Sequence, residues 1–283
     1  MIGQLWQPAD HDADSSAVTL HHGRLARFLA GSTGAEYWDG HWQEDGEIGE
    51  RLRRVEAGKL EAYDDMFAGH AAPGLYVEAG CGTGYVAEIL RRRGLRVVGL
   101  DYDAKTIARV SQVFPELDVR VGDVEALEFA DGSVGNYISL GVLEHLEHGP
   151  QKAIAEVARV LERHGKAFIS VPDLNTARRA FERYLQNHGA PRVSDNCTFN
   201  YYYYGRTEFS QLLTEGGLRV DELLPLFKLD YLTLEHPIFS RFWRSRLCRQ
   251  RVKRPLRRLI NAQQERLRSR YSHMMMYVCS KSP

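Results

Sequence analysis

The chain has 283 residues, of which 43% are hydrophobic and 26% are charged, and its formal net charge at pH 7 is zero. This length suits one large α/β domain with insertions, or two small domains. No segment approaches the roughly 18 consecutive apolar residues of a membrane span, and the N-terminus has neither the basic nor the apolar region of a secretory signal.

The N-terminal region, residues 1–48, is expected to form a tail and a lid outside the main domain. Residues 1–20 are polar and without periodicity, which is typical of a loose tail, and residues 21–47 hold aromatic residues in a Gly- and Asp-rich setting. Apolar positions recur at helical spacing in residues 49–69, which predicts a helix. We therefore expect a helical lid at this end of the domain.

Strands and single helices alternate through the middle of the chain. Short apolar runs that end in glycine, proline or an acid predict strands at 75–79, 95–101, 117–123, 133–140 and 166–172. Apolar positions three or four residues apart predict helices at 85–93, 104–113 and 151–163. This alternation predicts βαβ units and therefore a parallel, doubly wound sheet.

The alternation loosens after Pro172. Further segments are predicted as a helix at 175–187, a polar and aromatic loop at 188–205, a helix at 207–214, a strand at 218–227, two basic helices within 236–270 and a strand at 273–280. We therefore expect one α/β domain over residues 49–283, built on a doubly wound, seven-stranded, mostly parallel, Rossmann-like sheet. It carries an insertion at 175–205 and a basic helical insertion at 236–270, before the last strand.

The first predicted strand ends in a glycine-rich turn, Glu78-Ala79-Gly80-Cys81-Gly82-Thr83-Gly84. A strand, a Gly-x-Gly-x-Gly turn and a helix bring backbone N–H groups and a helix N-terminus close to a ligand. A dinucleotide site favours Gly-x-Gly-x-x-Gly with a pyrophosphate over the helix start. Here the third glycine comes one residue early, and the carboxylate of Glu78 would repel a pyrophosphate. S-adenosylmethionine carries an ammonium and a sulfonium group, so it suits this turn better.

Two further strand ends carry acids. Asp101 ends the second predicted strand, 21 residues after Gly80, where an acid can accept hydrogen bonds from both hydroxyls of a ribose. Asp123 ends the third strand, within reach of an adenine amino group. The three strand ends together indicate one nucleoside-type site at the crevice of the sheet.

These stretches resemble class I S-adenosylmethionine-dependent methyltransferases, in the broad small-molecule branch called type 11. The resemblance covers residues of about 70–172 and is carried by VEAGCGTGYVAEIL (77–90), VVGLDYD (97–103), VGDVEALEFADGSVGNYISLGVLEHL (121–146) and ERHGKAFISVP (162–172). The family's sheet has seven strands in the order 3-2-1-4-5-7-6, and its last strand is antiparallel. The count of seven predicted strands agrees with that topology.

The resemblance also implies roles for residues. In the family the glycine loop holds the methionine part of the donor, the acid that matches Asp101 holds the ribose, and the acid that matches Asp123 contacts the adenine. The stretch after the fourth strand lines the donor and the methyl group. The candidate cofactor-binding residues are therefore Glu78, Gly80, Cys81, Gly82, Gly84, Tyr85, Asp101, Tyr102, Asp123, Val124, Leu140, Gly141 and Val142.

Methyl transfer from a sulfonium is an in-line displacement, so the protein mainly aligns the nucleophile and excludes water. Oxygen acceptors usually need a base as well. His145, just after the fourth predicted strand, is the candidate catalytic residue because an imidazole titrates near neutrality. A structural role for His145 stays open as the alternative. We expect no metal site, since Glu144, His145 and His148 lack a second cluster of ligands.

The acceptor is expected to be a small molecule. Where DNA amino-methyltransferases carry Asn/Asp-Pro-Pro-aromatic after the fourth strand, this chain reads SLGV (139–142), which argues against a nucleic acid acceptor. Two aromatic clusters flank the site, and packing inside the domain is the alternative reading of each. The candidate substrate-binding residues from these clusters are Tyr37, Trp38, Trp42, Tyr201, Tyr203 and Tyr204.

The zero net charge hides an asymmetry. Residues 236–283 hold 13 Lys/Arg and one acid, whereas residues 1–235 hold 24 basic and 36 acidic residues. Apolar residues at helical spacing lie among the basic ones in 236–270. This segment either packs on the domain or on a second copy in a homodimer, or contacts an anionic membrane surface or an anionic acceptor. Four scattered cysteines without a CxxC pair predict free thiols and a cytoplasmic protein.

Three hypotheses follow. The first is a methyltransferase that uses S-adenosylmethionine to methylate a small molecule at oxygen or nitrogen. The second is a methyltransferase of a lipid-linked or saccharide acceptor at the membrane surface. The third, of another class, is a non-catalytic partner protein that only binds the donor.

Overall fold

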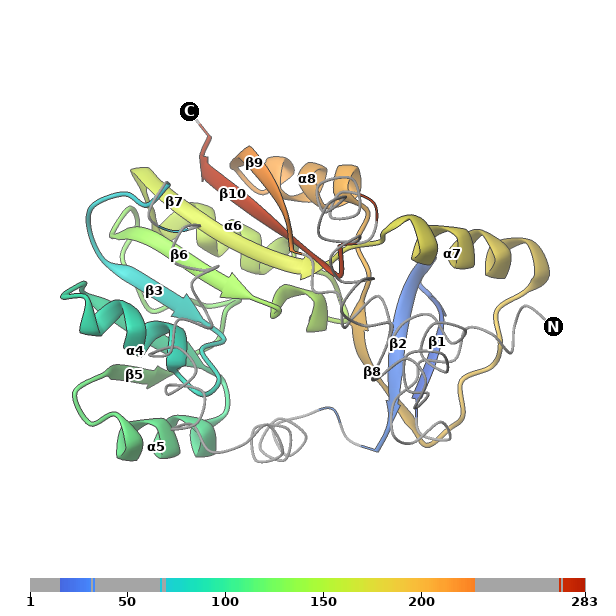
Figure 1. Cartoon of the computed structure of the whole chain (residues 1–283), viewed down its shortest axis with the longest axis horizontal. Helices are drawn as coiled ribbons and strands as arrows, with labels where there is room; N and C mark the ends of the chain where they lie inside the picture. The colour runs from blue at the N-terminus through green and yellow to red at the C-terminus, as the bar shows by residue number, and fades with distance from the viewer. Residues whose placement is uncertain are drawn as a thin grey trace, which may run out of the picture. The chain divides into compact units, whose positions relative to one another are not determined.

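The computed structural model describes residues 16–31, 33, 67, 70–226, 270 and 272–282, and these fall into two compact units (Figure 1). One unit holds most of a seven-stranded sheet with its helices. The other holds a three-stranded sheet with one helix. The predicted lid within 34–66 and nearly all of the basic insertion within 236–270 lie outside the described residues.

The seven-stranded sheet has the predicted topology. Its strands are β3 (Tyr76–Ala79), β4 (Val97–Asp101), β5 (Asp118–Val121), β6 (Val134–Leu140), β7 (Leu161–Pro172), β9 (Leu218–Leu226) and β10 (Met274–Lys281). They lie in the order β5-β4-β3-β6-β7-β10-β9, which is 3-2-1-4-5-7-6 in chain order. The first five are paired in parallel. Strand β10 runs antiparallel to β9, since backbone bonds join His273 to Leu226 at one end and Ser282 to Gly217 at the other.

Apolar sequence explains the central strands. Every residue of β3 and β4 is buried, as is every residue of β6 except its last, which is expected of parallel strands covered on both faces. Helices α4 (Tyr85–Arg92), α5 (Ala104–Val113), α6 (Gln151–Val160) and α8 (Arg206–Glu215) follow strands and each bury an apolar stripe. Asp103 caps α5, because its carboxylate accepts the N–H groups of Lys105 and Thr106. Among the described residues, no helix is long and apolar enough to cross a membrane.

The helix predicted at 151–163 ends earlier than expected. It stops at Val160, and Leu161 already has extended backbone angles and pairs with Val134 of β6. The helical periodicity of the sequence continues to Leu161, but the ladder to β6 draws this residue into the sheet. Strand β7 therefore begins five residues before the predicted strand at 166–172.

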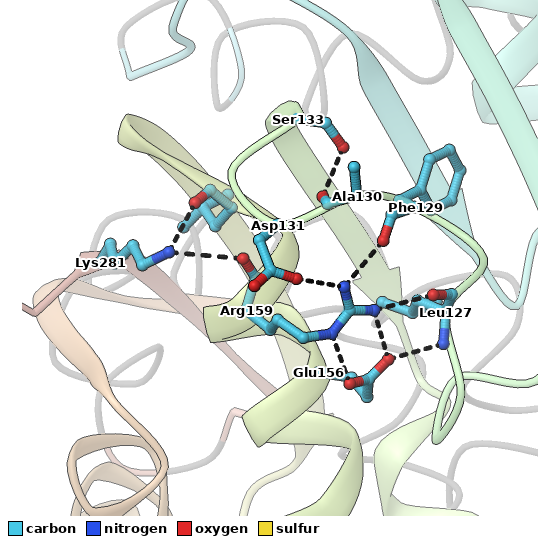
Figure 2. A network of polar contacts seen from close by, with 9 residues as sticks. Leu127, Phe129, Ala130, Asp131, Ser133, Glu156, Arg159 and Lys281 are labelled. Carbon is cyan, nitrogen blue, oxygen red and sulfur yellow. Dashed lines mark hydrogen bonds and ion pairs between the residues drawn. The ribbon is translucent and has the colours of Figure 1, made fainter.

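The connection from β5 to β6 is fixed by one side chain of α6. Figure 2 shows the guanidinium of Arg159, which donates to the carbonyl oxygens of Leu127 and Phe129 at 2.8 Å each and to Asp131 at 2.8 Å. Glu156 binds the same guanidinium and also accepts the N–H of Leu127 at 2.8 Å. The loop after the third strand is thus attached to a helix of the same unit.

The three-stranded sheet corrects two predictions. Residues 1–20 were expected to be a tail and 188–205 a loop. Instead β1 (Ser16–His21) and β2 (Arg24–Ala30) form an antiparallel hairpin, and β8 (Cys197–Tyr202) pairs with β2, giving the order β1-β2-β8.

Packing against a helix is the physical reason for the small sheet. Apolar side chains on one of its faces pack on helix α7 (Thr176–His188), which the sequence predicts at 175–187. The cluster consists of Leu25, Leu174, Phe181, Leu185 and Tyr203, with Val18, Leu20, Tyr184 and Tyr201 against it. Buried positions do not alternate strictly along β2 and β8, so no period of two stands out and the sequence alone indicates coil.

Candidate functional site

The turn between β3 and α4 requires its glycines. Gly80 and Gly84 have φ values of 77° and 70°, in the left-handed region. A Cβ on Gly80 would lie 2.3 Å from Cγ2 of Val142, and one on Gly84 would lie 2.6 Å from Cγ1 of Val110. A side chain at either position would strain the backbone and displace a neighbour. The turn therefore keeps bare backbone at the carboxyl edge of the sheet.

Two carboxylates bind backbone N–H groups of this turn and of the helix that follows it. Oε2 of Glu78, on β3, accepts the N–H of Ala87 in the first turn of α4 at 2.8 Å. Oδ2 of Asp101, at the end of β4, accepts the N–H of Gly82 at 2.9 Å, and its Oδ1 accepts the N–H of Asp103 at 3.0 Å. Glu78 is 4% exposed and Asp101 is 9% exposed. The two acids are thus built into the turn rather than placed on the surface.

The pair is acidic without a compensating cation among the described residues. Burial, with a smaller contribution from the charge of Asp101, raises the pKa of Glu78 to about 8 against the lowering effect of the Ala87 hydrogen bond. Burial also raises the pKa of Asp101, although the N–H groups that it accepts lower it. The buried thiol of Cys81 has a pKa well above its usual value, because of burial and then of the two acids. The site therefore disfavours anions and favours a positively charged ligand.

The ends of β4 and β5 supply the adjoining part of the site. Tyr102 follows Asp101 and is 53% exposed, one of the few large apolar side chains that face solvent among the described residues. Asp123 follows β5, is exposed, and accepts the N–H of Glu125 at 2.8 Å. Val124 is half-buried beside it. An aromatic face and a carboxylate at adjacent strand ends can contact a planar, amino-bearing ring.

The end of β6 closes the site on the other side of β3. Leu140, Gly141 and Val142 are half-buried, and Val142 lies against Gly80, as the distance given above for its Cγ2 shows. His145 ends the short 3₁₀ helix η2 (Leu143–His145) and is half-buried. Every predicted cofactor-binding residue, together with His145, therefore lies in one unit at the carboxyl ends of four neighbouring strands.

Buried polar side chains near these strand ends were missed by the sequence reasoning. Glu144 of η2 is 3% exposed, and its Oε2 has no hydrogen-bond partner among the described residues. Burial raises its pKa to about 8, against the lowering effect of its own N–H. The hydroxyl of Thr83 in the glycine turn is likewise buried without a hydrogen-bond partner among the described residues. The sequence does place Glu144 inside the apolar run LGVLEHL (140–146). That position alone does not show whether the carboxyl is buried or exposed. The described residues contain no group of three side chains that could hold a metal.

The predicted acceptor residues belong to the other unit or fall outside the described residues. Tyr201, Tyr203 and Tyr204 belong to the unit of the three-stranded sheet. The hydroxyls of Tyr201 and Tyr203 are 3.3 Å apart, the guanidinium carbon of Arg178 lies 4.4 Å from the ring centre of Tyr203, and Tyr204 is fully buried. Their contribution to an acceptor site stays a prediction. Tyr37, Trp38 and Trp42 lie outside the described residues.

The residues present fit S-adenosylmethionine. The uncompensated Glu78–Asp101 pair matches a ligand with an ammonium and a sulfonium group. A nicotinamide or flavin dinucleotide would place a pyrophosphate beside Glu78, which these charges oppose.

Comparison with known proteins agrees. Residues 77–169 match the family described as a methyltransferase domain. A relative from Mycolicibacterium smegmatis, named "probable S-adenosylmethionine-dependent methyltransferase", is 32% identical over 151 residues, which are 53% of this chain and 54% of that protein. A ubiquinone biosynthesis O-methyltransferase from Erwinia tasmaniensis is 28% identical over 58% of this chain and 66% of its own length. The chain therefore spans about half the length of the first of these relatives.

A solved structure shares the fold. The geranyl diphosphate C-methyltransferase from Streptomyces coelicolor superposes with a TM-score of 0.50 over 83% of this chain and 83% of its own, at 16% sequence identity. At this identity the likeness concerns the arrangement of the sheet and its helices. It agrees with the strand order found here.

Proposed function

We propose that this chain, a class I S-adenosylmethionine-dependent methyltransferase by its fold and by the family of residues 77–169, transfers the methyl group of that donor to an oxygen or nitrogen atom of a small molecule. The observation that carries the proposal is the assembly of the glycine turn, Glu78 and Asp101 at one edge of the parallel sheet. An electrophilic methyl group on sulfonium is the chemistry that the bound donor supplies.

The chain's own residues divide the work of holding the donor. Glu78 faces the ammonium group. The N–H groups of Gly80, Cys81, Gly82 and Gly84 already donate to Leu100, Asp101 and Cys81, so the carboxylate of the methionine part falls to the N–H of Thr83 and to the start of α4. Asp101 accepts both ribose hydroxyls, in addition to the N–H groups that it already binds. Tyr102, Asp123 and Val124 surround the adenine. Leu140, Gly141 and Val142 exclude water from the methyl group, which favours displacement over hydrolysis.

Transfer needs alignment and the removal of one proton. The C–S bond of the donor breaks as the bond from the methyl carbon to the acceptor oxygen or nitrogen forms, so the acceptor atom must lie in line with it. The acceptor's proton passes to His145, which is half-buried in η2, three residues after Val142. The relative named for ubiquinone biosynthesis supports an oxygen acceptor in a small molecule.

Two measurements test the function. Calorimetry with S-adenosylmethionine should show saturable binding, and its absence at high micromolar donor would contradict the proposal. Candidate phenolic and amine acceptors are then incubated with donor, and product is detected by mass spectrometry as a gain of one methyl group. A protein that binds the donor but forms no S-adenosylhomocysteine with any acceptor would instead support a non-catalytic partner role.

The base is tested by a pair of variants. His145→Ala should lower kcat by about 10²–10⁴-fold, the usual effect of losing a general base, and leave donor affinity unchanged. His148→Ala is the matched control, because His148 is exposed just beyond η2. Equal kcat in both variants would assign His145 a structural role and leave the acceptor proton to water.

The composition of residues 236–270 favours a second candidate, a lipid-linked or saccharide acceptor at a membrane surface. Basic and apolar residues at helical spacing can bind anionic lipid. Flotation with anionic vesicles should then recover the protein at low salt and lose it at high salt. If it never floats, packing on the domain or on a second copy is favoured, and sedimentation distinguishes monomer from homodimer.

A further inference from the structure

We propose that S-adenosylmethionine binding expels one proton from the Glu78–Asp101 pair, so that this pair selects ligands by their positive charge. The proposal rests on the proposed function, because it concerns the same donor site. It adds a property that donor binding alone does not imply, namely a release of protons and a dependence of donor affinity on pH.

The geometry places two acids at the ends of adjacent parallel strands. Ala79 of β3 pairs with Leu100 of β4. Glu78 comes one residue before this pair on β3, and Asp101 comes one residue after it on β4. Both bind N–H groups of one segment, residues 82–87, as described above. Because backbone anchors them, neither carboxylate can rotate into solvent when it ionises.

Positive side chains do not offset the pair among the described residues. Arg91 and Arg92 on α4 both donate from Nε to the buried carboxylate of Glu88, at 2.7 Å each. The titratable groups that act on the pair from the loop and from β4 are Cys81, Tyr102 and Asp103, none of which carries a positive charge. Among the described residues, the groups that favour the ionised state of the pair are backbone N–H groups.

Two buried, interacting acids without a cation do not both ionise readily. The more buried member, Glu78, keeps the proton at neutral pH, in agreement with its pKa of about 8. Donor binding brings an ammonium group beside Glu78, and this positive charge favours two carboxylates despite their burial. The balance is simple: the protonated pair and the cationic donor give the doubly ionised pair with donor bound, and one proton passes to the buffer.

Calorimetry in two buffers tests this directly. At about pH 6.5, where an α-amino group keeps its own proton, wild-type protein is titrated with S-adenosylmethionine in phosphate and in Bis-Tris. The difference in enthalpy should correspond to about one proton released, and affinity should tighten up to tenfold between about pH 5.5 and pH 6.5. A buffer-independent enthalpy and a pH-independent affinity would overturn the proposal.

Variants identify the source of the proton. Glu78→Gln imitates the protonated side chain, keeps an acceptor for Ala87, and should bind donor without releasing a proton. Asp101→Asn removes the repelling charge and should reduce the release. Glu144→Gln is the matched control, since Glu144 is equally buried and also has a raised pKa but lies outside the pair. Loss of release in the control with retention in Glu78→Gln would overturn the assignment.

The two proposals can fail separately. No donor binding by folded wild-type protein at any pH would contradict the proposed function. Normal binding without proton release would contradict only this inference. If Glu78→Gln is folded by circular dichroism but binds too weakly to titrate, the two-buffer result on wild-type protein and the Asp101→Asn result still decide.

Discussion

Asp101 combines two roles at the scale of a single residue. Its carboxylate holds the turn through Gly82 and is the predicted acceptor for the ribose hydroxyls. Asp101→Ala should therefore weaken donor binding by about 1–3 kcal/mol, the usual effect of leaving buried hydrogen-bond partners unpaired. Calorimetry with S-adenosylhomocysteine measures the change.

Asp118→Ala provides the comparison for Asp101. Asp118 is an exposed acid on the edge strand β5, and its ion pair with Arg120 is local. Its removal should leave donor affinity unchanged, because surface pairs contribute little. Equal affinities for the Asp101 variant and wild type would refute the ribose assignment.

Gly80 shows why the turn admits no side chain. Gly80→Ala places a Cβ 2.3 Å from Cγ2 of Val142 on a backbone with positive φ, and it should cost about 1–3 kcal/mol of folding free energy from overpacking beyond the backbone strain. Chemical denaturation measures the cost. Donor binding should be lost as the turn shifts.

Gly132→Ala is the control that separates the effect of backbone strain from the effect of crowding by a neighbour. It also has positive φ, at 63°, but a Cβ there would meet nothing within 4 Å, so Gly132→Ala should cost only the backbone term. In the double variant Gly80→Ala/Val142→Ala, both γ-methyl groups of Val142 that crowd this position are gone, and stability should partly recover. Equal losses in the two single alanine variants would show that crowding by Val142 is unimportant.

Several site residues could be predicted because chemistry and chain position agree. Glycines that alternate after a strand, and acids at the next strand ends, indicate Gly80, Glu78 and Asp101 from the sequence, and the structure brings them together. The burial of Glu144 could not be predicted, since its apolar neighbours in 140–146 suit either a strand end or a surface turn. The contact between Gly80 and Val142 joins residues 62 positions apart, which no local pattern reveals.

At the scale of elements, Arg159 joins α6 to the loop that precedes β6. Arg159→Lys keeps the charge but cannot reach Leu127, Phe129 and Asp131 together, because a lysine lacks the planar fork of a guanidinium. Hydrogen exchange should become faster at the amides of residues 127–133 and stay unchanged in α4. The melting temperature should fall.

Arg120→Gln is the control for this element. Arg120 also binds a carboxylate, that of Asp118, but both partners lie on the same strand and join no separate segments. Exchange in 127–133 should therefore match wild type. If Arg159→Lys leaves exchange in this loop unchanged, the loop is held by its own backbone bonds.

Elements with a strong period were predictable, and those that depend on distant pairing were not. Strands β3, β4 and β6 are apolar runs, and α5 has a cap in Asp103, so local sequence suffices. The boundary at Val160 depends on the pairing of Leu161 with Val134. Strand β8 depends on β2, which lies about 170 residues earlier, as the bond from Thr198 to Gly31 illustrates.

At the scale of the whole molecule, paired carboxylates and buried carboxyls affect the pH dependence of folding stability in opposite ways. Glu156 is hydrogen-bonded to Arg159, which lowers its pKa, so its stabilising effect is present at neutral pH and is lost as the pH falls through that lowered pKa. Glu78 and Glu144 behave in the opposite way, because burial raises their pKa values to about 8. Their ionisation lowers the stability of the folded protein as the pH rises toward 8 and beyond.

The donor-free protein should therefore be most stable near pH 5 and less stable at pH 9. Between the usual glutamate pKa of 4.5 and about 8, the folded state binds more protons than the unfolded state, so the free energy of unfolding falls as pH rises. Each acid contributes up to about 1.4 kcal/mol per pH unit in this window. Urea unfolding from pH 5 to 9 measures the slope. Glu144→Gln should make this slope less steep by up to about 1.4 kcal/mol per pH unit, the contribution of one proton. Glu128→Gln, at an exposed position, should leave the slope unchanged. An unchanged slope in Glu144→Gln would show that this carboxyl ionises freely in the folded protein.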